Sequence, residues 1–142
     1  MVKNLIKTNL FESQEDYLKI IYLISKTKHG GWVSNGEISL RLNVKPSSVS
    51  DMLHKLEDLG LINWKPRSAI RLTEKGKIIA EQLIYRYKLM KIVISNIFEI
   101  EDENFLNEIC CKIEHDIPVE LCESVSVQYQ SILNKSKKKD SS

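Results

Sequence analysis

The most constraining feature of this sequence is a pair of short helical segments joined by a very tight turn. The first spans residues 34–42, and Asn43 is typical of a helix end. The second spans 46–59 and has Pro46 near its first position, where proline is well tolerated. Each segment is apolar on one side, through Ile38 and Leu42 and through Val49, Met52, Leu53 and Leu56. The spacing predicts a helix-turn-helix.

A basic β-hairpin is predicted directly after this pair. The β-capable stretches 61–64 and 69–72 flank the turn Lys65-Pro66-Arg67-Ser68. A helix over 14–26, with Ser13 as its N-cap, precedes the pair. The order helix, helix-turn-helix and hairpin is that of a winged helix, so the predicted fold class is mainly α, with a winged helix-turn-helix followed by an all-helical domain.

The remainder of the chain reads as helical. A long helix begins at Glu74 with Thr73 as cap and runs to about Phe98, and further helices are expected over about 102–115 and 118–133. We therefore predict a winged-helix domain over 1–73, a helical domain over 74–134, and a basic, disordered tail over 135–142. The 142 residues exclude a large multidomain enzyme.

Cysteine usage and hydropathy indicate a soluble, cytoplasmic protein. The chain has three Cys, an odd number, and two of them are adjacent, which disfavours a secreted disulfide scaffold. The opening MVKNLIKTNL has no apolar signal core. No apolar run reaches the roughly 18 residues that a membrane span needs, so no membrane partner is expected.

The net charge of +2 conceals an uneven distribution. Residues 45–77 hold seven Lys and Arg against four carboxylates, a balance of +3. Residues 99–123 hold nine carboxylates against Lys112, a balance of −8. This division favours polyanion contact in the first region and assembly or cation handling in the second.

Short polar and basic residues mark the start of the second helix of the pair. Such residues suit a recognition helix, because they contact phosphates and base edges without steric demand. Arg67 at the hairpin tip can reach a minor groove or a phosphate. The alternative is a helical hairpin used only for protein contact. The predicted DNA-binding residues are Lys45, Pro46, Ser47, Ser48, Ser50, Asp51, His54, Lys55 and Arg67.

Five motifs stand in order along the chain: Glu15–Tyr22, Val44–Val49, Leu59–Ile62, Leu72–Lys77 and Ile113–His115. Together they resemble the diphtheria-toxin-repressor family of metal-dependent regulators, and the manganese transport regulator branch fits best. The resemblance implies a winged-helix DNA-binding domain over 1–73, a helical dimerisation and metal-sensing domain over 74–134, and repression of metal-uptake genes when a divalent metal binds between them. Its partners would be a double-stranded DNA operator and a second copy of the chain.

A metal set is predicted in the acidic region. Cys111, Glu114 and His115 stand at i, i+3 and i+4, so on one helix they would share a face and offer thiolate, carboxylate and imidazole. The neighbouring Cys110 reads as a buried small hydrophobe. The resemblance adds Asp16 as a fourth ligand, and implies one divalent transition metal per subunit: Mn or Fe, with Zn as a further candidate.

Two departures from the family keep metal independence open as an alternative. Lys19 stands where the manganese branch has a glutamate, and Tyr87 where it has a histidine; Lys91 likewise replaces a glutamate of larger relatives. An ammonium in place of a carboxylate disfavours a second metal. Lys19 could instead pair with Asp16 or Glu114, and a different metal site could use Cys122.

The sequence disfavours an enzyme. Cys111 and His115 could form a nucleophile and base, but no Gly-rich oxyanion turn accompanies them. The predicted function is a dimeric repressor whose helices beyond residue 74 pair the subunits through a buried apolar surface. That surface is expected to include Phe105, Ile109, Val119 and Leu121.

Overall fold

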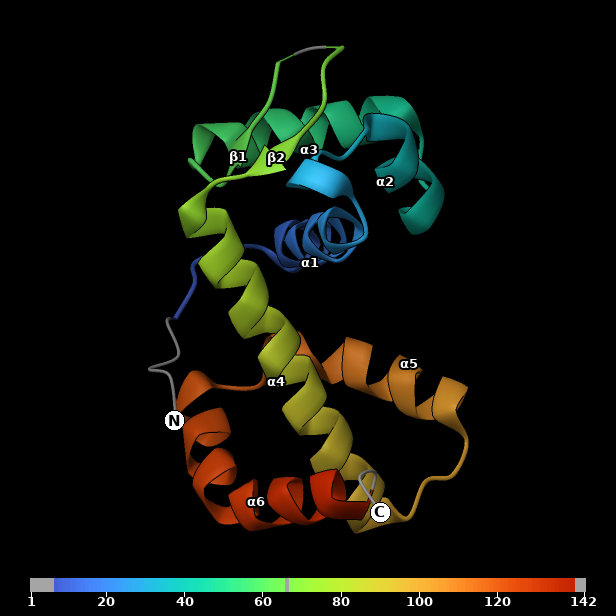
Figure 1. Ribbon diagram of the computed structural model, residues 1–142, viewed down its shortest axis with the longest axis vertical. Helices are drawn as coiled ribbons and strands as arrows, with labels where there is room; N and C mark the ends of the chain where they lie inside the picture. The colour runs from blue at the N-terminus through green and yellow to red at the C-terminus, as the bar shows by residue number, and fades with distance from the viewer. Residues whose placement is uncertain (1–6, 66, 140–142) are drawn as a thin grey trace. The chain divides into compact units, whose positions relative to one another are not determined.

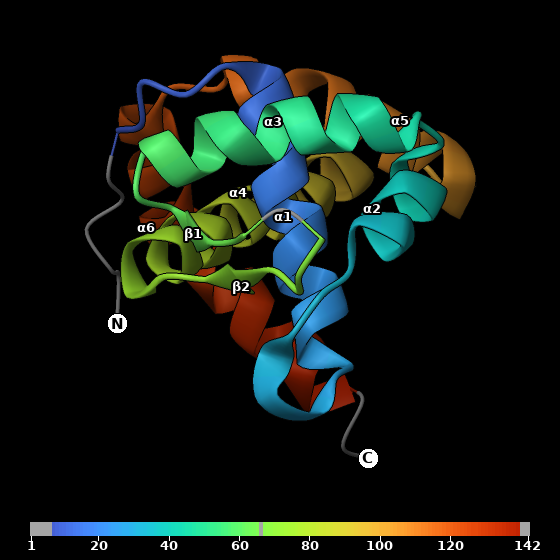
Figure 2. The ribbon, with the colours of Figure 1, turned by 90° about the horizontal axis from the view of Figure 1, so that it is seen from above.

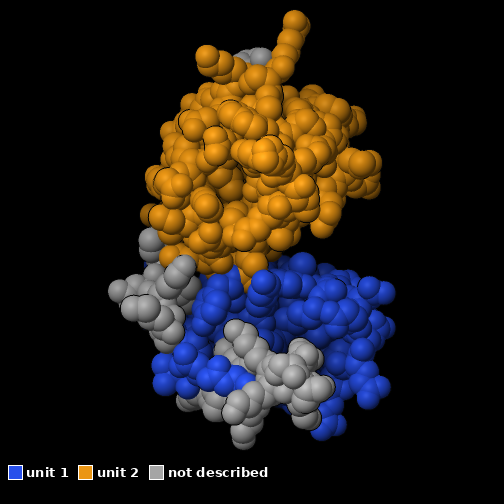
Figure 3. Space-filling view, viewed as in Figure 1, with its two compact units in different colours: residues 1–7, 85–142 blue, residues 8–84 orange. Residues whose placement is uncertain are grey.

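A computed structural model describes residues 7–65 and 67–139, and it is mainly helical, as predicted. The chain forms two compact units (Figure 3): residues 8–84, here the winged-helix unit, and residues 85–142 with 1–7, here the C-terminal unit. The elements, labelled in Figure 1, are α1 (Glu12–Lys26), η1 (His29–Gly31), α2 (Asn35–Leu42), α3 (Pro46–Asp58), β1 (Ile62–Asn63), β2 (Arg71–Leu72), α4 (Glu74–Phe98), α5 (Glu103–Ile113), η2 (Glu114–Asp116) and α6 (Val119–Lys139).

The winged-helix unit is built around α1. This helix packs against α2, α3, β2 and the short η1 turn, and in the view of Figure 2 it passes behind α3 and the hairpin. Leu18 and Ile21 of α1 meet Ile38 of α2 and Leu53 of α3 in one core, and all four are fully buried. Apolar residues three or four positions apart lie on the same face of a helix. This spacing turns one face of each helix toward the core.

Ser34 and Glu37 form a capping box at the start of α2. Ser34 Oγ accepts a hydrogen bond of 3.2 Å from the backbone N–H of Glu37. The Glu37 carboxylate accepts in return from the backbone N–H of Ser34, at 2.9 Å. The ammonium of Lys28 and this N–H lower the pKa of the Glu37 carboxyl. Asn43 ends the helix with φ of 53°, in the left-handed region that asparagine tolerates.

The start of α1 differs from the prediction. Ser13 is not the N-cap, because the helix begins at Glu12 and Phe11 occupies the cap position. The backbone N–H of Phe11 donates instead to the Gln14 side chain at 3.0 Å. The Gln14 side chain, in the first turn, therefore satisfies the backbone N–H of the cap residue Phe11, which has no partner within the helix.

The hairpin is confirmed, and the helix after it packs closely on its base. Ile62 pairs with Leu72 and Asn63 with Arg71 in an antiparallel register. Thr73 caps α4 as expected, since its Oγ1 accepts from the N–H of Gly76 at 3.1 Å. A Cβ on Gly76 would lie 2.0 Å from the carbonyl oxygen of Leu61, so this position requires glycine.

The C-terminal unit has two small apolar clusters that include side chains of α4. In one, Leu89 packs with Cys122 of α6. In the other, Ile94 packs with Leu106 and Cys110 of α5. Asp102 caps α5 by accepting from two backbone amides of its first turn. Cys110 is fully buried, as predicted, and burial raises the pKa of its thiol.

Three predicted boundaries differ from the structure. The compact units divide at 84/85 rather than at 73/74, because Ile79, Ala80 and Leu83 of α4 belong to the winged-helix core. The helix expected to end at His115 ends at Ile113 and continues as the 3-10 turn η2. The disordered tail expected over 135–142 is helical as far as Lys139, and residues 140–142 lie outside the described part.

Among the described residues, no helix combines the length and the hydropathy that crossing a membrane requires.

Candidate nucleic-acid interface and metal-ligating residues

The first turn of α3 presents a short polar surface. Lys45 is the N-cap and Pro46 the first helical residue, and both are exposed together with Ser47 and Ser48. The first backbone amides of a helix have no intrahelical partner, so this end attracts phosphate groups. Val49, on the opposite side, is fully buried. The amphipathic pattern of α3 thus fixes which side chains remain available to a nucleic acid.

Ser50, one of the predicted DNA-binding residues, takes part in holding α2 against α3. Its hydroxyl donates to the carbonyl of Pro46 at 3.2 Å and accepts from the Asn35 side chain at 3.0 Å. Asn35 also donates to the same carbonyl, at 3.3 Å. The two side chains fix the angle of the helix-turn-helix, which is a role that the sequence reasoning missed.

The remaining predicted contacts on α3 lie further along the helix. Asp51, His54 and Lys55 are exposed. The His54 ring meets Trp64 edge to face, with 4.7 Å between the ring centroids. Trp64 is buried, so it is part of the core as the sequence indicated. Its packing connects the hairpin to α3.

Arg67 occupies the tip of the hairpin. It is exposed and has φ of 63°. The turn is closed by Ser68, whose backbone N–H donates to the Lys65 carbonyl at 2.9 Å and whose hydroxyl donates to the same oxygen at 2.6 Å. Pro66, between them, lies outside the described residues. The hairpin therefore holds a guanidinium at the outermost point of the wing.

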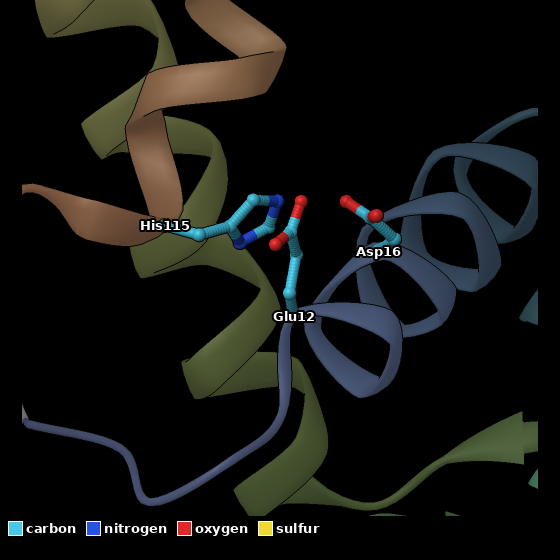
Figure 4. A group of neighbouring side chains, drawn as sticks. All are labelled: Glu12, Asp16 and His115. Atoms are coloured by element: carbon cyan, nitrogen blue, oxygen red, sulfur yellow. The ribbon is translucent and has the colours of Figure 1, made fainter.

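In the winged-helix unit, the candidate metal ligands lie on α1. Glu12 and Asp16 are four residues apart, so they project from the same face of the helix. Figure 4 draws both, together with His115 of η2. Lys19 Nζ lies 3.6 Å from Asp16 Oδ1. The contact between Lys19 and Asp16 is one of the two pairings predicted for a metal-independent protein.

In the C-terminal unit, the candidate ligands lie on the η2 turn. Glu114 is buried, and its Oε1 lies 3.3 Å from Nε2 of His115, whose side chain is also little exposed. Arg86 of α4 holds this turn in place. Its guanidinium donates to the backbone carbonyls of Glu114 at 2.7 Å and of Ile117 at 3.2 Å.

Cys111 differs from these two residues in exposure. It is exposed on α5, whereas Glu114, directly after the end of that helix, is buried and the His115 side chain is little exposed. The helix predicted to reach His115 changes to the 3-10 turn η2 after Ile113. Cys111 stays a predicted ligand. Cys122 is buried beside Leu89.

The two substituted positions on α4 are engaged with α5. The Tyr87 hydroxyl donates to the Asn107 side chain at 2.6 Å. Lys91 forms an ion pair with Glu103, which raises the pKa of its ammonium. Each side chain therefore has a structural role inside the C-terminal unit.

Two residues next to the candidate metal ligands, Glu12 and Arg86, were not predicted from the sequence. Glu12 could have been found from its spacing of four to Asp16. Arg86 carries no such signal, because its role depends on carbonyls 28 and 31 residues away.

Comparison with known proteins places the chain among transcriptional regulators. The model of the iron-dependent repressor N-terminal DNA-binding domain matches residues 9–70. An uncharacterized HTH-type transcriptional regulator of Methanocaldococcus jannaschii is 35% identical over 124 residues, which cover 87% of this chain and 98% of that protein. The HTH-type transcriptional regulator MntR of Oceanobacillus iheyensis is 34% identical over 97 residues, covering 68% of this chain and 64% of that protein.

The fold agrees with that of solved relatives. The crystal structure of IdeR from T. acidophilum aligns with a TM-score of 0.68 at 28% identity. The alignment covers 88% of this chain but 56% of IdeR, so the chain spans little more than half of that solved relative. These matches, together with the winged helix, show that the chain belongs to the diphtheria toxin repressor, or iron-dependent repressor, family of helix-turn-helix transcriptional regulators and is not an enzyme.

Proposed function

We propose that this chain is a homodimeric repressor of metal-ion homeostasis genes that works in the cytoplasm and is controlled by a divalent transition metal. Its partner is a double-stranded, pseudo-palindromic DNA operator, with one recognition helix in each half-site. The observation that carries the proposal is the exposed first turn of α3, where Lys45, Ser47 and Ser48 surround the helix N-terminus. Arg67 at the wing tip supports it.

The proposed DNA contacts divide into two kinds. Arg67 contacts the backbone or a minor groove, whereas Ser47 faces base edges. Gel-shift titrations with Arg67→Ala should therefore weaken binding to all sequences and flatten the salt dependence, while Ser47→Ala should change the sequence preference. Equal losses from both variants on every DNA would contradict this division. Absence of binding to random DNA at low salt would instead favour a module that binds only proteins.

The proposed metal ligands are the set predicted from the sequence: Asp16, Cys111, Glu114 and His115. The carboxylates and the imidazole suit iron or manganese, and the thiolate would shift the preference toward iron or zinc. Glu12, four residues before Asp16 on α1, offers a further carboxylate oxygen. When bound, the cation would supply positive charge that offsets the repulsion among these carboxylates.

A second candidate is a regulator of the same fold without metal dependence. The 3.6 Å approach of Lys19 to Asp16 favours it, because an ammonium already balances one proposed ligand. In this case the DNA-binding form would persist without any metal.

Calorimetric titration of reduced protein with Mn²⁺, Fe²⁺ and Zn²⁺ separates the two candidates. The metal-controlled protein gives a saturable heat and a higher operator affinity, and His115→Ala abolishes both. Cys111→Ser is the matched test of the thiolate: with Cys111 as a ligand, the variant should lose affinity for Fe²⁺ and Zn²⁺ more than for Mn²⁺, and unchanged binding of all three metals would remove Cys111 from the set. No heat and no change in operator affinity would establish the metal-independent form.

The homodimer is proposed from apolar side chains that the C-terminal unit leaves exposed. Phe105 and Leu121, two of the predicted interface residues, are 52% and 46% exposed, and Phe98 is 68% exposed. Ile109 and Val119 instead pack partly against the clusters of their own unit. Sedimentation equilibrium tests the proposal, which predicts a dimer at micromolar concentration.

A further inference from the structure

A second cationic surface lies on the winged-helix unit, away from α3. It is a pocket of ≈ 270 Å³ bordered by the end of α1, the η1 turn, β2 and the first turn of α4. Three cations line it, Lys26, Arg71 and Lys77, against the single carboxylate of Glu74 among the lining residues. All four side chains are exposed. The charge balance of this pocket is therefore +2.

The pocket is shaped by its backbone and by aromatic neighbours. Gly30 and Gly31 form one wall with φ of 78° and 72°, so no side chain closes that side. The Lys26 ammonium lies 4.9 Å from the centre of the Tyr22 ring. The Arg71 guanidinium lies 5.4 Å from the centre of the Trp32 ring. These contacts limit the freedom of two cations, which lowers the entropic cost of binding an anion between them.

The position of the pocket relates it to the DNA-binding face. β1 packs on α3, β2 pairs with β1, and β2 and η1 pack on α1. In Figure 2 the order across the face is accordingly α3, the hairpin, and then the η1 segment on the far side of the hairpin. The pocket therefore lies beside the hairpin, on the side away from α3.

We propose that Lys26, Arg71 and Lys77 form a phosphate-binding site that holds the DNA backbone beyond the wing. This inference rests on the proposed function, because it extends the surface with which the chain would contact its operator. Phosphate is the fitting ligand, since it is a compact anion that several Lys and Arg side chains can share. The site contacts no bases. It therefore makes the affinity increase with the length of the duplex and leaves the sequence preference unchanged.

The test compares two duplexes with the same central site, selected from random DNA. One ends at the wing contact, and the other extends about one helical turn, roughly 10 base pairs, further on each side. The double variant Lys26→Gln, Lys77→Gln should lower the slope of log K against log salt by about 1.8 on the long duplex, since each lost phosphate contact removes about 0.9. On the short duplex it should behave as the unaltered protein.

A matched control removes the same charge elsewhere. Lys88→Gln with Lys112→Gln alters two exposed lysines of the C-terminal unit, and the slopes on both duplexes should remain unchanged. An unchanged slope for the pocket variant on the long duplex would overturn the DNA assignment, as would an equal loss with the control variant.

Titration with inorganic phosphate distinguishes the source of the anion and is independent of DNA binding. Saturable NMR shifts of the Gly30 and Gly31 amides that vanish in the double variant support the site. If these NMR shifts occur but the double variant has the same salt slope as the unaltered protein on both duplexes, the site binds free phosphate instead of DNA. If neither effect is seen, no phosphate site exists there. If the unaltered protein binds no duplex at all, the proposed function fails, while this titration still decides the pocket.

Discussion

The two units of this chain bury their apolar residues in different ways. Among the described residues, the winged-helix unit joins sixteen buried residues into one core that all of its helices share. The described residues of the C-terminal unit form two separate clusters of two and three buried residues. Both units also bury charged side chains: Glu15 in the winged-helix unit, and Arg86 and Glu114 in the C-terminal unit.

This difference indicates different sources of stability. One continuous core supports the winged helix by itself, so its surface is free to serve recognition. Small separate clusters give less stability per residue, and such a unit gains from a partner subunit or a bound ion. The assembly and sensing role that we propose for the C-terminal unit predicts this pattern of burial. Four variants test this comparison.

The largest effect is expected where the hairpin meets α4. Gly76→Ala places a methyl group 2.0 Å from the Leu61 carbonyl oxygen, a clash with backbone that only movement of the helix can relieve. Unfolding in urea should show a loss of about 3 kcal/mol or more. Gly36→Ala in α2 is the control: its nearest neighbour is 4.0 Å away, and we expect no loss.

Arg86→Met should destabilise the C-terminal unit alone. The variant removes two hydrogen bonds from a guanidinium that is 6% exposed, which costs about 2 to 3 kcal/mol. Hydrogen exchange should accelerate at Ile117 and Cys122, next to η2, and remain slow at Leu53. Lys88→Met, an exposed position two residues on, is the control. Uniform acceleration through both units would contradict the separation of their cores.

Phe98→Ser with Phe105→Ser should weaken the proposed dimer. Both rings are exposed in the single chain, and losing one buried ring from an interface costs on the order of 1.4 kcal/mol or more, a factor of about ten in Kd. Analytical ultracentrifugation measures the shift. Leu40→Ser is the control, because Leu40 is 85% exposed but belongs to the winged-helix unit. An equal effect of Leu40→Ser would contradict an interface in the C-terminal unit and favour one in the winged-helix unit.

The smallest effect concerns a helix cap. Ser34→Ala removes the acceptor for the Glu37 amide and should cost about 1 kcal/mol in thermal unfolding. Ser13→Ala should change stability by less than about 0.5 kcal/mol, because Ser13 is exposed in the first turn of α1 and does not cap it. A larger loss from Ser13→Ala would restore the cap that the sequence predicted.

Most of the fold was predictable because its signals are local. Pro46 and Ser34 mark helix starts, and Asn43 and Gly60 mark helix ends, by backbone preferences that need no tertiary contact. The exposed residues at the start of α3 follow from the same local pattern, since burial of Val49 leaves Ser47 and Ser48 on the other side.

The candidate ligands were less predictable, because their arrangement depends on where a helix stops. The helix predicted over 102–115 changes to a 3-10 turn after Ile113, and in the structure Glu114 is buried whereas Cys111 is exposed. No strong terminating residue follows Ile113; Arg86, which fixes this turn, is distant in the sequence. The metal itself stays a proposal.

By itself, the sequence determined the helix-turn-helix and the basic wing, because capping, helical periodicity and turn chemistry act within a few residues. The resemblance to the family comes from the order of its motifs. Only the tertiary structure decided that α4 contributes to both units, that Ser50 holds the helix pair together, and that three cations from α1, β2 and α4 surround one pocket. These features join residues far apart in the chain. Their energies come from packing and hydrogen bonds that exist only once the elements have met.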